Sequence, residues 1–383
     1  MDFTLTTQQR DIQKAASEFA KGEFDPDAAL DYDLRQQFPL NVWKNASELG
    51  FIGACFPEEY GGQELGLLEN ALIVETFCRQ DSGIGMALAL SDFGSEMIVR
   101  NGNEDQKKKI LPFIAQGEGI VTSAFLEEGC FLAPFTTTAK ISNNGCIING
   151  MKSFVTLGSI ADYIIVVCQT RLDKPHAQTV ILLKREIDGI EVSSMGEKVG
   201  MRMVPVDQVA FANVRVPAEN IVGQEDTGYF QLQDFFNEMR IKTGAMGIGI
   251  AQGGLDKALE YSKKREQFGK PIASFDAIRN KLADMYIDVE MARLITYKAA
   301  WSFDTGAPDD RAILISKMIA SKAAYKTTYD AVQIYGGYGY MTEGHIEHFY
   351  RDAKVLDLFL EPGQIQRNML ADHILGGVSE KRS

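Results

Sequence analysis

The sequence predicts a mainly α-helical protein with a β-rich middle domain. Segments near both ends carry apolar residues at helical spacing, whereas short β-branched runs separated by turn residues fill the middle. We therefore divide the 383 residues into an N-terminal helical domain (1–120), a small β-barrel or sandwich (121–228) and a C-terminal four-helix bundle (229–383). A chain of this length can bury a sizeable core.

The N-terminal domain is predicted to begin with a capped helix. Thr6 and Gln9 have the spacing of a capping box, and an apolar stripe from Ile12 to Phe19 follows them. A Gly-Gly loop is expected at 56–66. Further helices are expected over 39–49, 67–79, 83–99 and 103–117.

The middle and C-terminal parts differ in texture. Runs such as IVTSAF, YIIVVCQT and QTVILLKR predict strands, and the segment 216–228 reads as a connecting loop. Helices of the bundle are predicted over 229–266, 276–304 and 308–335, with a last one beginning near Gly363. Gly244, Gly247 and Gly249 in the first of them are poor helix formers and indicate close backbone approach.

Composition and charge exclude several classes of function. The net charge of -13 and the pI of about 4.9 disfavour nucleic acid as the main partner, because its phosphates would be repelled. The five cysteines form no CxxC pair, and the four histidines show no metal spacing; His345 and His348 are expected to be solvated. No metal is predicted. The polar start and the lack of long apolar runs predict a cytoplasmic protein.

Three motifs offer side chains or backbone that suit a ligand with a flat ring and phosphate groups. Phe154 and Thr156 offer an aromatic plate and a small hydroxyl, which suit a flat ring with polar edges. Arg265 offers a forked donor for a phosphate. Gly336 and Gly337 would allow a ligand to approach the backbone closely. Each motif alone also fits an ordinary strand, helix end or loop.

The order and spacing of these motifs resemble the acyl-CoA dehydrogenase family over nearly the whole chain. The resemblance implies FAD as cofactor, with the phosphate motif reaching the FAD of a neighbouring subunit in a homotetramer. It also implies an acyl-CoA substrate and electron-transfer flavoprotein as electron acceptor. The implied FAD contacts are Phe125, Leu126, Phe154, Thr156, Arg265, Phe268, Gln333, Gly336, Gly337 and Gln364.

The substrate side departs from the usual family pattern. In SAFLEEGCFLAPF (123–135), Leu126 replaces a threonine, and Phe131 and Leu132 replace a Gly-Ser pair. These replacements predict a bulkier and more apolar pocket. By the same resemblance, the substrate contacts are Arg240, Leu132, Met239 and Leu360.

The family's catalytic glutamate is absent from both of its customary positions. By count those positions are Leu360 and Met239, while Glu361 and Glu238 each lie one residue away, about 100° around a helix. Asp92 is the candidate replacement, because it stands in an apolar segment that lines the acyl pocket in the family, where desolvation would strengthen a base. Asp92 or Ser91 could instead simply N-cap a helix beginning at Phe93.

A displaced base implies proton removal from a different carbon. With a 1,2-double bond conjugated to the thioester, the γ-hydrogen at C3 of a ring is acidic, and hydride could leave from C6. This pattern resembles the cyclohex-1-ene-1-carboxyl-CoA dehydrogenases of anaerobic aromatic metabolism, which form cyclohexa-1,5-diene-1-carboxyl-CoA by 1,4-elimination. The alternatives are 2,3-dehydrogenation of a short, branched or alicyclic acyl-CoA by Glu361 or Glu238, a non-catalytic acyl-CoA-binding flavoprotein, and an oxidase or monooxygenase.

Overall fold

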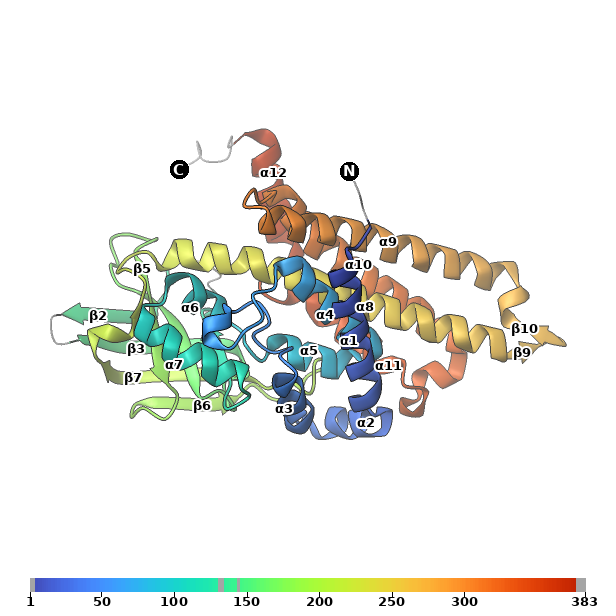
Figure 1. Cartoon of the computed structure of the whole chain (residues 1–383), viewed down its shortest axis with the longest axis horizontal. Helices are drawn as coiled ribbons and strands as arrows, with labels where there is room; N and C mark the ends of the chain where they lie inside the picture. The colour runs from blue at the N-terminus through green and yellow to red at the C-terminus, as the bar shows by residue number, and fades with distance from the viewer. Residues whose placement is uncertain (1–3, 130–133, 143–144, 377–383) are drawn as a thin grey trace.

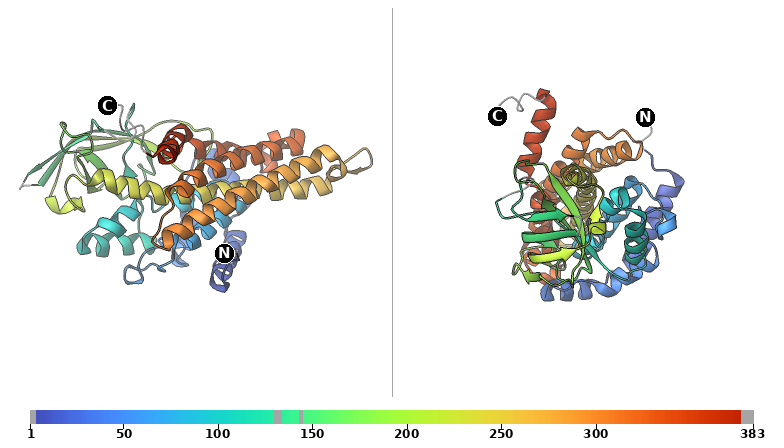
Figure 2. Two further views of the ribbon diagram at one scale, coloured as in Figure 1. Left: turned by 90° about the horizontal axis from the view of Figure 1, so that it is seen from above. Right: turned by 90° about the vertical axis from the view of Figure 1, so that its left-hand side faces the viewer.

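The computed structural model describes residues 4–129, 134–142 and 145–376, and it confirms the predicted fold class. Helices α1 to α7 come first, a β-sheet follows, and the long helices α8 to α12 complete the chain (Figure 1). The sheet lies at one end of the molecule, and the hairpin that joins α8 to α9 lies at the other (Figure 2).

The first helical part agrees with the prediction except at one break. Thr6 and Gln9 form the predicted capping box, with their reciprocal hydrogen bonds at 3.1 and 2.9 Å. The single helix predicted over 83–99 is wrong, because Gly94 has a φ of 100° and the chain turns between two helices. The helices are α1 (Thr7–Glu23), α2 (Pro26–Arg35), α3 (Leu40–Glu48), α4 (Leu67–Gln80), α5 (Ser82–Leu90), α6 (Ser95–Asn101) and α7 (Glu104–Ala115).

The middle part is one mostly antiparallel sheet in the order β6-β7-β3-β2-β4-β5-β8, with β1 paired in parallel to β4. Two register shifts interrupt the long β3–β7 ladder, one of them between Lys152 and Val155. The strands are β1 (Val121–Ala124), β2 (Thr138–Ser142), β3 (Gly145–Thr156), β4 (Tyr163–Gln169), β5 (Gln178–Lys184), β6 (Ile190–Ser194), β7 (Val206–Val216) and β8 (Ile221–Val222).

The C-terminal part is built around α8, which packs against α10 on one side and α4 on the other. Helix α11 was not predicted, because its sequence was interpreted as part of a glycine-rich cofactor motif. The helices are α8 (Gly228–Lys264), α9 (Asp276–Asp304), α10 (Asp310–Tyr335), α11 (Glu347–Leu358) and α12 (Gly363–Leu375), and β9 (Glu266–Gln267) and β10 (Lys270–Pro271) form the hairpin between α8 and α9.

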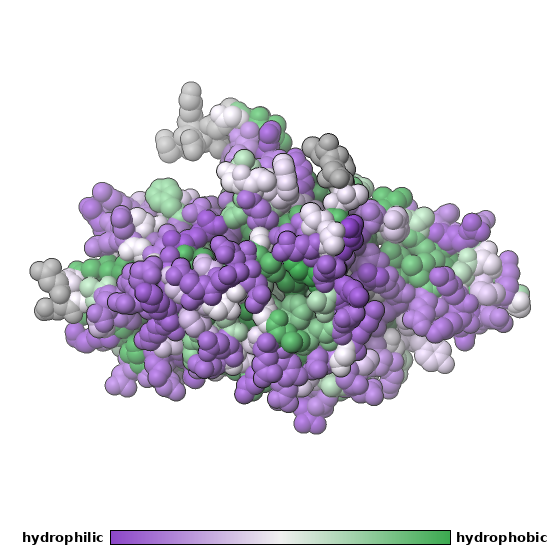
Figure 3. Space-filling model, viewed as in Figure 1, coloured by the Kyte–Doolittle hydropathy of each residue, from purple (hydrophilic) through white to green (hydrophobic). Residues whose placement is uncertain are grey.

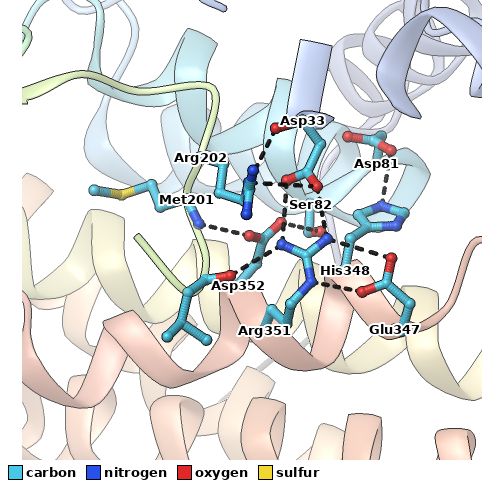
Figure 4. A network of polar contacts seen from close by, with 10 residues as sticks. Asp33, Asp81, Ser82, Met201, Arg202, Glu347, His348, Arg351 and Asp352 are labelled. Atoms are coloured by element: carbon cyan, nitrogen blue, oxygen red, sulfur yellow. Dashed lines mark hydrogen bonds and ion pairs between the residues drawn. The ribbon is translucent and has the colours of Figure 1, made fainter. Parts of the chain in front are cut away.

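A buried polar network joins the three parts of the chain (Figure 4). Asp352 on α11 accepts hydrogen bonds of 2.6 Å each from the Ser82 hydroxyl on α5 and the Met201 backbone N–H before β7. Next to it, His348 contacts Asp81 at 3.0 Å. The expectation that His348 is solvated is therefore wrong, because the carboxylate of a sequence-distant helix turns the ring inward.

Candidate active site

The residues predicted to face the flavin ring lie together where β1 leaves the sheet and β3 ends. Lys152 and Glu127 form a buried ion pair at 2.8 Å, and the same ammonium donates to the Phe125 carbonyl at 3.1 Å. The Ser153 N–H donates to the Leu126 carbonyl at 2.9 Å. These contacts fix the 125–127 segment against β3. Although burial opposes it, the Lys152 ammonium and the Thr136 donors hold the pKa of Glu127 at about 2.

Phe154 lies at the register shift of β3 and has a φ of 54°. Phe154 as a whole residue is 58% exposed, whereas Thr156 is buried and accepts at its carbonyl from the Thr122 hydroxyl. Such exposure is unusual for a large aromatic side chain in a strand, and it leaves a flat apolar face free for a ligand. In α12, both side-chain polar atoms of Gln366 are buried without a partner among the described residues, which is the kind of vacancy that a polar cofactor edge fills.

The residues predicted to hold the ADP part of FAD lie at the opposite end of the bundle. Arg265, Gly336 and Gly337 line one groove of about 490 Å³, and a Cβ added at either glycine would meet nothing within 4 Å. Phe268 in the β9–β10 turn is 92% exposed, and Gln333 on α10 is exposed as well. The structure thus brings this set together and keeps it apart from the ring-facing set near the sheet (Figure 1).

Asp92 lies in the turn between α5 and α6 and caps neither helix. Helix α6 begins at Ser95 after Gly94, and the Ser91 hydroxyl donates to the Leu88 carbonyl, so the interpretation of Asp92 or Ser91 as an N-cap at Phe93 is wrong. Asp92 is buried, and its Oδ1 lies 2.7 Å from Lys242 Nζ on α8. A carboxylate removed from water and held by one specific cation is typical of functional sites.

The cavity beside Asp92 has a volume of about 310 Å³ and a charged wall. Its ionisable lining residues are Asp92, Glu96, Arg100, Glu238, Lys242, Asp304 and the Cys55 thiol. The charged wall of this cavity differs from the apolar pocket that the sequence predicts. Leu126, Met239 and Leu360, on which that prediction rests, do not line this cavity. Phe131 and Leu132, also predicted for that pocket, lie outside the described residues.

Burial raises the pKa of Glu96 in this cavity to about 7, with Asp92 and Glu238 adding to the rise and Lys242 opposing it. Burial also raises the pKa of Glu238, although Arg100 lies 2.6 Å from it. Burial alone would lower the pKa of Lys242, but the Asp92 and Glu96 carboxylates raise it overall. The cavity therefore holds one carboxyl group, that of Glu96, that exchanges protons near neutral pH beside a charged lysine.

The two positions where the family usually carries its catalytic glutamate hold buried apolar side chains. Met239 and Leu360 are both buried, and Leu360 has a φ of 63°. Glu361 is fully buried, and its Oε1 accepts from Arg240 Nε at 2.7 Å. Arg240, predicted as a substrate contact, is thus paired inside the protein with Glu361 and, at 2.7 Å, with Asn237. The other carboxylate oxygen of Glu361, Oε2, is buried without a hydrogen-bond partner among the described residues.

An aromatic cluster connects the Asp92 turn to the ring-facing wall. The ring centroid of Phe93 lies 6.2 Å from that of Phe125, 5.1 Å from Phe235 and 5.7 Å from Phe359. Phe125 is a predicted flavin contact, and Phe359 immediately precedes the closed base position. The chain segment that carries Asp92 is therefore packed directly against both.

Sequence reasoning missed Lys242, the partner of Asp92. A signal was present, because Lys242 is the single charged residue in the apolar, glycine-rich run IKTGAMGIGIA (241–251). Lysine is almost never fully buried unless it is paired. A lone lysine in such a run therefore indicates a buried carboxylate partner elsewhere in the chain.

The order of a helical part, a β-sheet and a second helical part is that of the acyl-CoA dehydrogenase class of fold. Family models agree with this class: the acyl-CoA dehydrogenase N-terminal domain matches residues 6–118, the middle domain 127–214 and the C-terminal domain 226–375. The chain belongs to the acyl-CoA dehydrogenase family.

Known relatives support this membership over the full length. The chain is 34% identical to the probable acyl-CoA dehydrogenase YngJ of Bacillus subtilis (strain 168), covering 98% of this chain and 100% of the relative. It is 32% identical to a 3-(aryl)acrylate reductase of Clostridium sporogenes (strain ATCC 15579), covering 97% and 99%. The structure of butyryl-CoA dehydrogenase from Megasphaera elsdenii matches with a TM-score of 0.93 and 32% identity, covering 98% and 100%.

The protein is accordingly an oxidoreductase of the acyl-CoA dehydrogenase type, and its family implies a flavin cofactor. Within residues 4–129, 134–142 and 145–376, no helix combines the length and apolar character needed to cross a membrane.

Proposed function

We propose that this protein dehydrogenates an acyl-CoA thioester with FAD and that Asp92 is the base. One observation carries the proposal: Asp92 lies buried at a 310 Å³ cavity, 2.7 Å from Lys242, while both customary base positions are apolar. A carboxylate at the wall of a cavity is placed where a ligand can reach it, as proton abstraction requires. The Lys242 ammonium donates to Asp92 Oδ1 at 2.7 Å and so fixes the position of the carboxylate at the cavity wall.

FAD fits the residues on both sides of the molecule. Phe154 and Thr156, with the backbone of Phe125 and Leu126, would hold the ring, and Gln364 and the unpartnered Gln366 would meet it from α12. When bound, FAD supplies the hydride acceptor at N5 of its ring.

The ADP-binding set would serve a second copy of the chain. Arg265, which lines the same groove as Gly336 and Gly337, and Phe268 in the β9–β10 turn lie at the far end of the bundle from the ring-facing set. This separation supports a cofactor shared between subunits, and hence a homotetramer. Electron-transfer flavoprotein remains the proposed electron acceptor, and the cytoplasm the proposed location.

For the acyl group we propose cyclohex-1-ene-1-carboxyl-CoA, converted to cyclohexa-1,5-diene-1-carboxyl-CoA. A base that occupies a different wall from Leu360 and Met239 reaches a different carbon of the substrate. In a 1-ene thioester the C3 proton is acidified through the conjugated double bond, so Asp92 would take this proton while hydride leaves C6. The displaced position of Asp92 supports this 1,4-elimination.

The test is anaerobic reduction of the bound flavin. Wild type and Asp92→Asn, both loaded with FAD, are mixed with cyclohex-1-ene-1-carboxyl-CoA, and the absorbance at about 450 nm is followed. Because a positioned base contributes roughly 10²–10⁴-fold, the variant should bleach at least about 100-fold more slowly. Asp105→Asn, at an exposed position on α7, is the matched control and should bleach like wild type.

A second candidate base lies in the same cavity. Glu238 lines it, 2.6 Å from Arg100, whereas Glu361 is enclosed with Arg240. If Asp92→Asn still dehydrogenates a saturated acyl-CoA and Glu238→Gln does not, the reaction is a 2,3-dehydrogenation by Glu238. If none of the acyl-CoA compounds tested bleaches the flavin of the wild type, the protein is a non-catalytic binder.

A further inference from the structure

The cavity wall carries charges in a fixed alternation between two helices. Glu96 and Arg100 stand one turn apart on α6, and Glu238 and Lys242 stand one turn apart on α8. Across the helix contact, Lys242 Nζ lies 3.6 Å from Glu96 Oε1, and Arg100 Nε lies 2.6 Å from Glu238 Oε1. Together with Asp92, these side chains form a row of alternating charges along the cavity wall.

The row leads from the interior toward solvent. The side chains of Asp92 and Lys242 are 12% and 8% exposed, Glu96 is 14% exposed, and Arg100 at the outer end is 37% exposed. The outer end of the cavity is formed by Phe303 and Asp304 of α9. Arg100 is therefore the member of the row that is most open to solvent.

Glu96 is oriented to receive a proton from the Lys242 side. Its Oε2 accepts a hydrogen bond of 3.0 Å from the Gly94 backbone N–H, so Oε1 is left toward Lys242. With a pKa of about 7, Glu96 can both accept and release a proton near neutrality. The other ionisable groups that face it are Asp92, Arg100, Glu238, Asp304 and the Cys55 thiol.

A base inside the protein must lose the proton that it has taken up before it can act again. Once Asp92 holds the substrate proton it is neutral, and Glu96, 3.6 Å away, is then the carboxylate paired with Lys242. Lys242 Nζ lies 2.7 Å from Asp92 Oδ1 but 3.6 Å from Glu96 Oε1, so Lys242 attracts the negative charge more strongly when Asp92 carries it. Charge balance in the row therefore favours movement of the proton outward.

We propose that Glu96 is the proton acceptor that regenerates Asp92, and that Lys242 carries the proton between them. Asp92 Oδ1 gives its proton to Lys242 Nζ while Lys242 gives one of its three protons to Glu96 Oε1. Asp92 is then again a carboxylate, Lys242 again an ammonium and Glu96 a neutral acid, and no electrons move. Glu96 finally releases the proton to water. This inference rests on the proposed role of Asp92.

The test compares two signals in one stopped-flow experiment. FAD-loaded wild type, Glu96→Gln and the surface control Glu260→Gln are mixed anaerobically with cyclohex-1-ene-1-carboxyl-CoA in weak buffer with a pH indicator dye. In wild type and the control, proton release should follow flavin bleaching closely. In Glu96→Gln, release should lag behind bleaching by at least tenfold, because glutamine still accepts from the Gly94 N–H but cannot take up a proton.

Coincident traces in Glu96→Gln would overturn the relay while leaving Asp92 as the base. Absence of bleaching in wild type would overturn both, since there would be no proton to carry. A substrate-free measurement checks the acceptor directly: infrared pH titration of the FAD-loaded protein should show a protonated-carboxyl band near neutrality. The relay is excluded if that band persists in Glu96→Gln.

Discussion

Asp92 and Glu361 are both buried carboxylates, and their partners give them different roles. Asp92 meets Lys242 at the edge of a cavity, whereas Glu361 meets Arg240 inside the packed core, and Lys317 donates to the Glu361 backbone carbonyl at 2.7 Å. A charge next to a cavity can exchange protons with a ligand. A charge enclosed by the fold mainly neutralises its partner.

Replacing Glu361 with leucine should destabilise the protein by about 3–5 kcal/mol, because Arg240 would remain buried without its counter-charge. The free energy of unfolding in urea measures this loss. Glu260→Leu, which removes an exposed partner of Lys264 on α8, is the control and should have little effect. Equal stability of wild type and Glu361→Leu would show that Arg240 finds another partner.

At the scale of elements, the contact between α4 and α8 depends on glycine. A Cβ on Gly249 would lie 2.4 Å from the Glu75 carbonyl oxygen on α4. Helix α4 cannot easily withdraw, because the Glu75 carboxylate is held by Arg293 at 2.9 Å and by the Tyr297 hydroxyl at 2.7 Å. The predicted close backbone approach at Gly249 is confirmed.

We expect Gly249→Ala to lower the free energy of unfolding by about 1–3 kcal/mol through overpacking. Gly22→Ala is the matched control, because Gly22 lies in α1 with nothing within 4 Å of an added Cβ. It should stabilise the protein by about 0.5–1 kcal/mol, since alanine is the better helix former. Thermal or urea unfolding of the two variants should therefore shift in opposite directions; a shift in the same direction would contradict the packing argument.

The turn between α5 and α6 has a functional consequence. If residues 83–99 formed one helix, Asp92 would simply occupy a position on a continuous helical face. Instead the chain turns at Gly94, and Asp92 reaches Lys242 on α8. The break in the helical pattern therefore places the candidate base.

At the scale of the whole molecule, the polar network around Asp352 links all three parts of the chain (Figure 4). Burial raises the pKa of Asp352 to about 6, so the folded state holds its proton more tightly than the unfolded state does. The contribution of this group to stability is therefore present below about pH 4 and is lost as the pH rises through about 6.

Asp352→Asn should remove that pH dependence. The stability difference, wild type minus variant, should fall by about 3 kcal/mol between roughly pH 4 and pH 7, two pKa units being worth about that much. Unfolding free energies measured across this range give the difference curve. If the variant also loses a hydrogen bond from Ser82 or Met201, the difference in unfolding free energy shifts by the same amount at every pH. A difference that does not change with pH would contradict the raised pKa of Asp352.

The surface of the bundle supports assembly. Figure 3 shows hydrophobic side chains gathered over α9 on an otherwise mostly hydrophilic face. Five large hydrophobic residues of α9 are each more than half exposed: Tyr286, Ile287, Met291, Leu294 and Trp301. Apolar surface of this kind is typical of protein–protein interfaces, in agreement with the proposed homotetramer.

Arg265→Ala tests the shared cofactor site. Because a charge-assisted hydrogen bond contributes about 1.5–3 kcal/mol, FAD affinity should fall roughly 10- to 100-fold. FAD titration of the apoprotein measures the affinity, and analytical ultracentrifugation should show a tetramer for both proteins. Arg35→Ala, from an exposed pair with Asp31, is the control. Unchanged affinity in Arg265→Ala would place the ADP part of FAD elsewhere.

The sequence by itself determined the element types and the family. Apolar spacing predicted α9 with its observed bounds and α8 and α10 to within two residues, because these long helices bury continuous stripes. Counting residues from the family motifs was likewise enough to show that leucine (Leu360) and methionine (Met239) occupy the two positions where the family carries its catalytic glutamate. The apolar pattern did not predict the break at Gly94, because the pattern continues through a residue whose positive φ ends the helix. It did not predict α11 either, because the residues of α11 follow a glycine-rich motif that resembles a cofactor loop.

Only the tertiary structure decided which charges meet. Asp92 and Lys242 are 150 residues apart, and Arg240 and Glu361 are 121 residues apart, so no local spacing relates them. The same holds for His348, which the sequence placed in solvent and the fold pairs with Asp81. The cost of burying a charge is met by whichever opposite charge the packing of distant helices brings within reach, and that choice determines which carboxylate is enclosed and which faces a cavity.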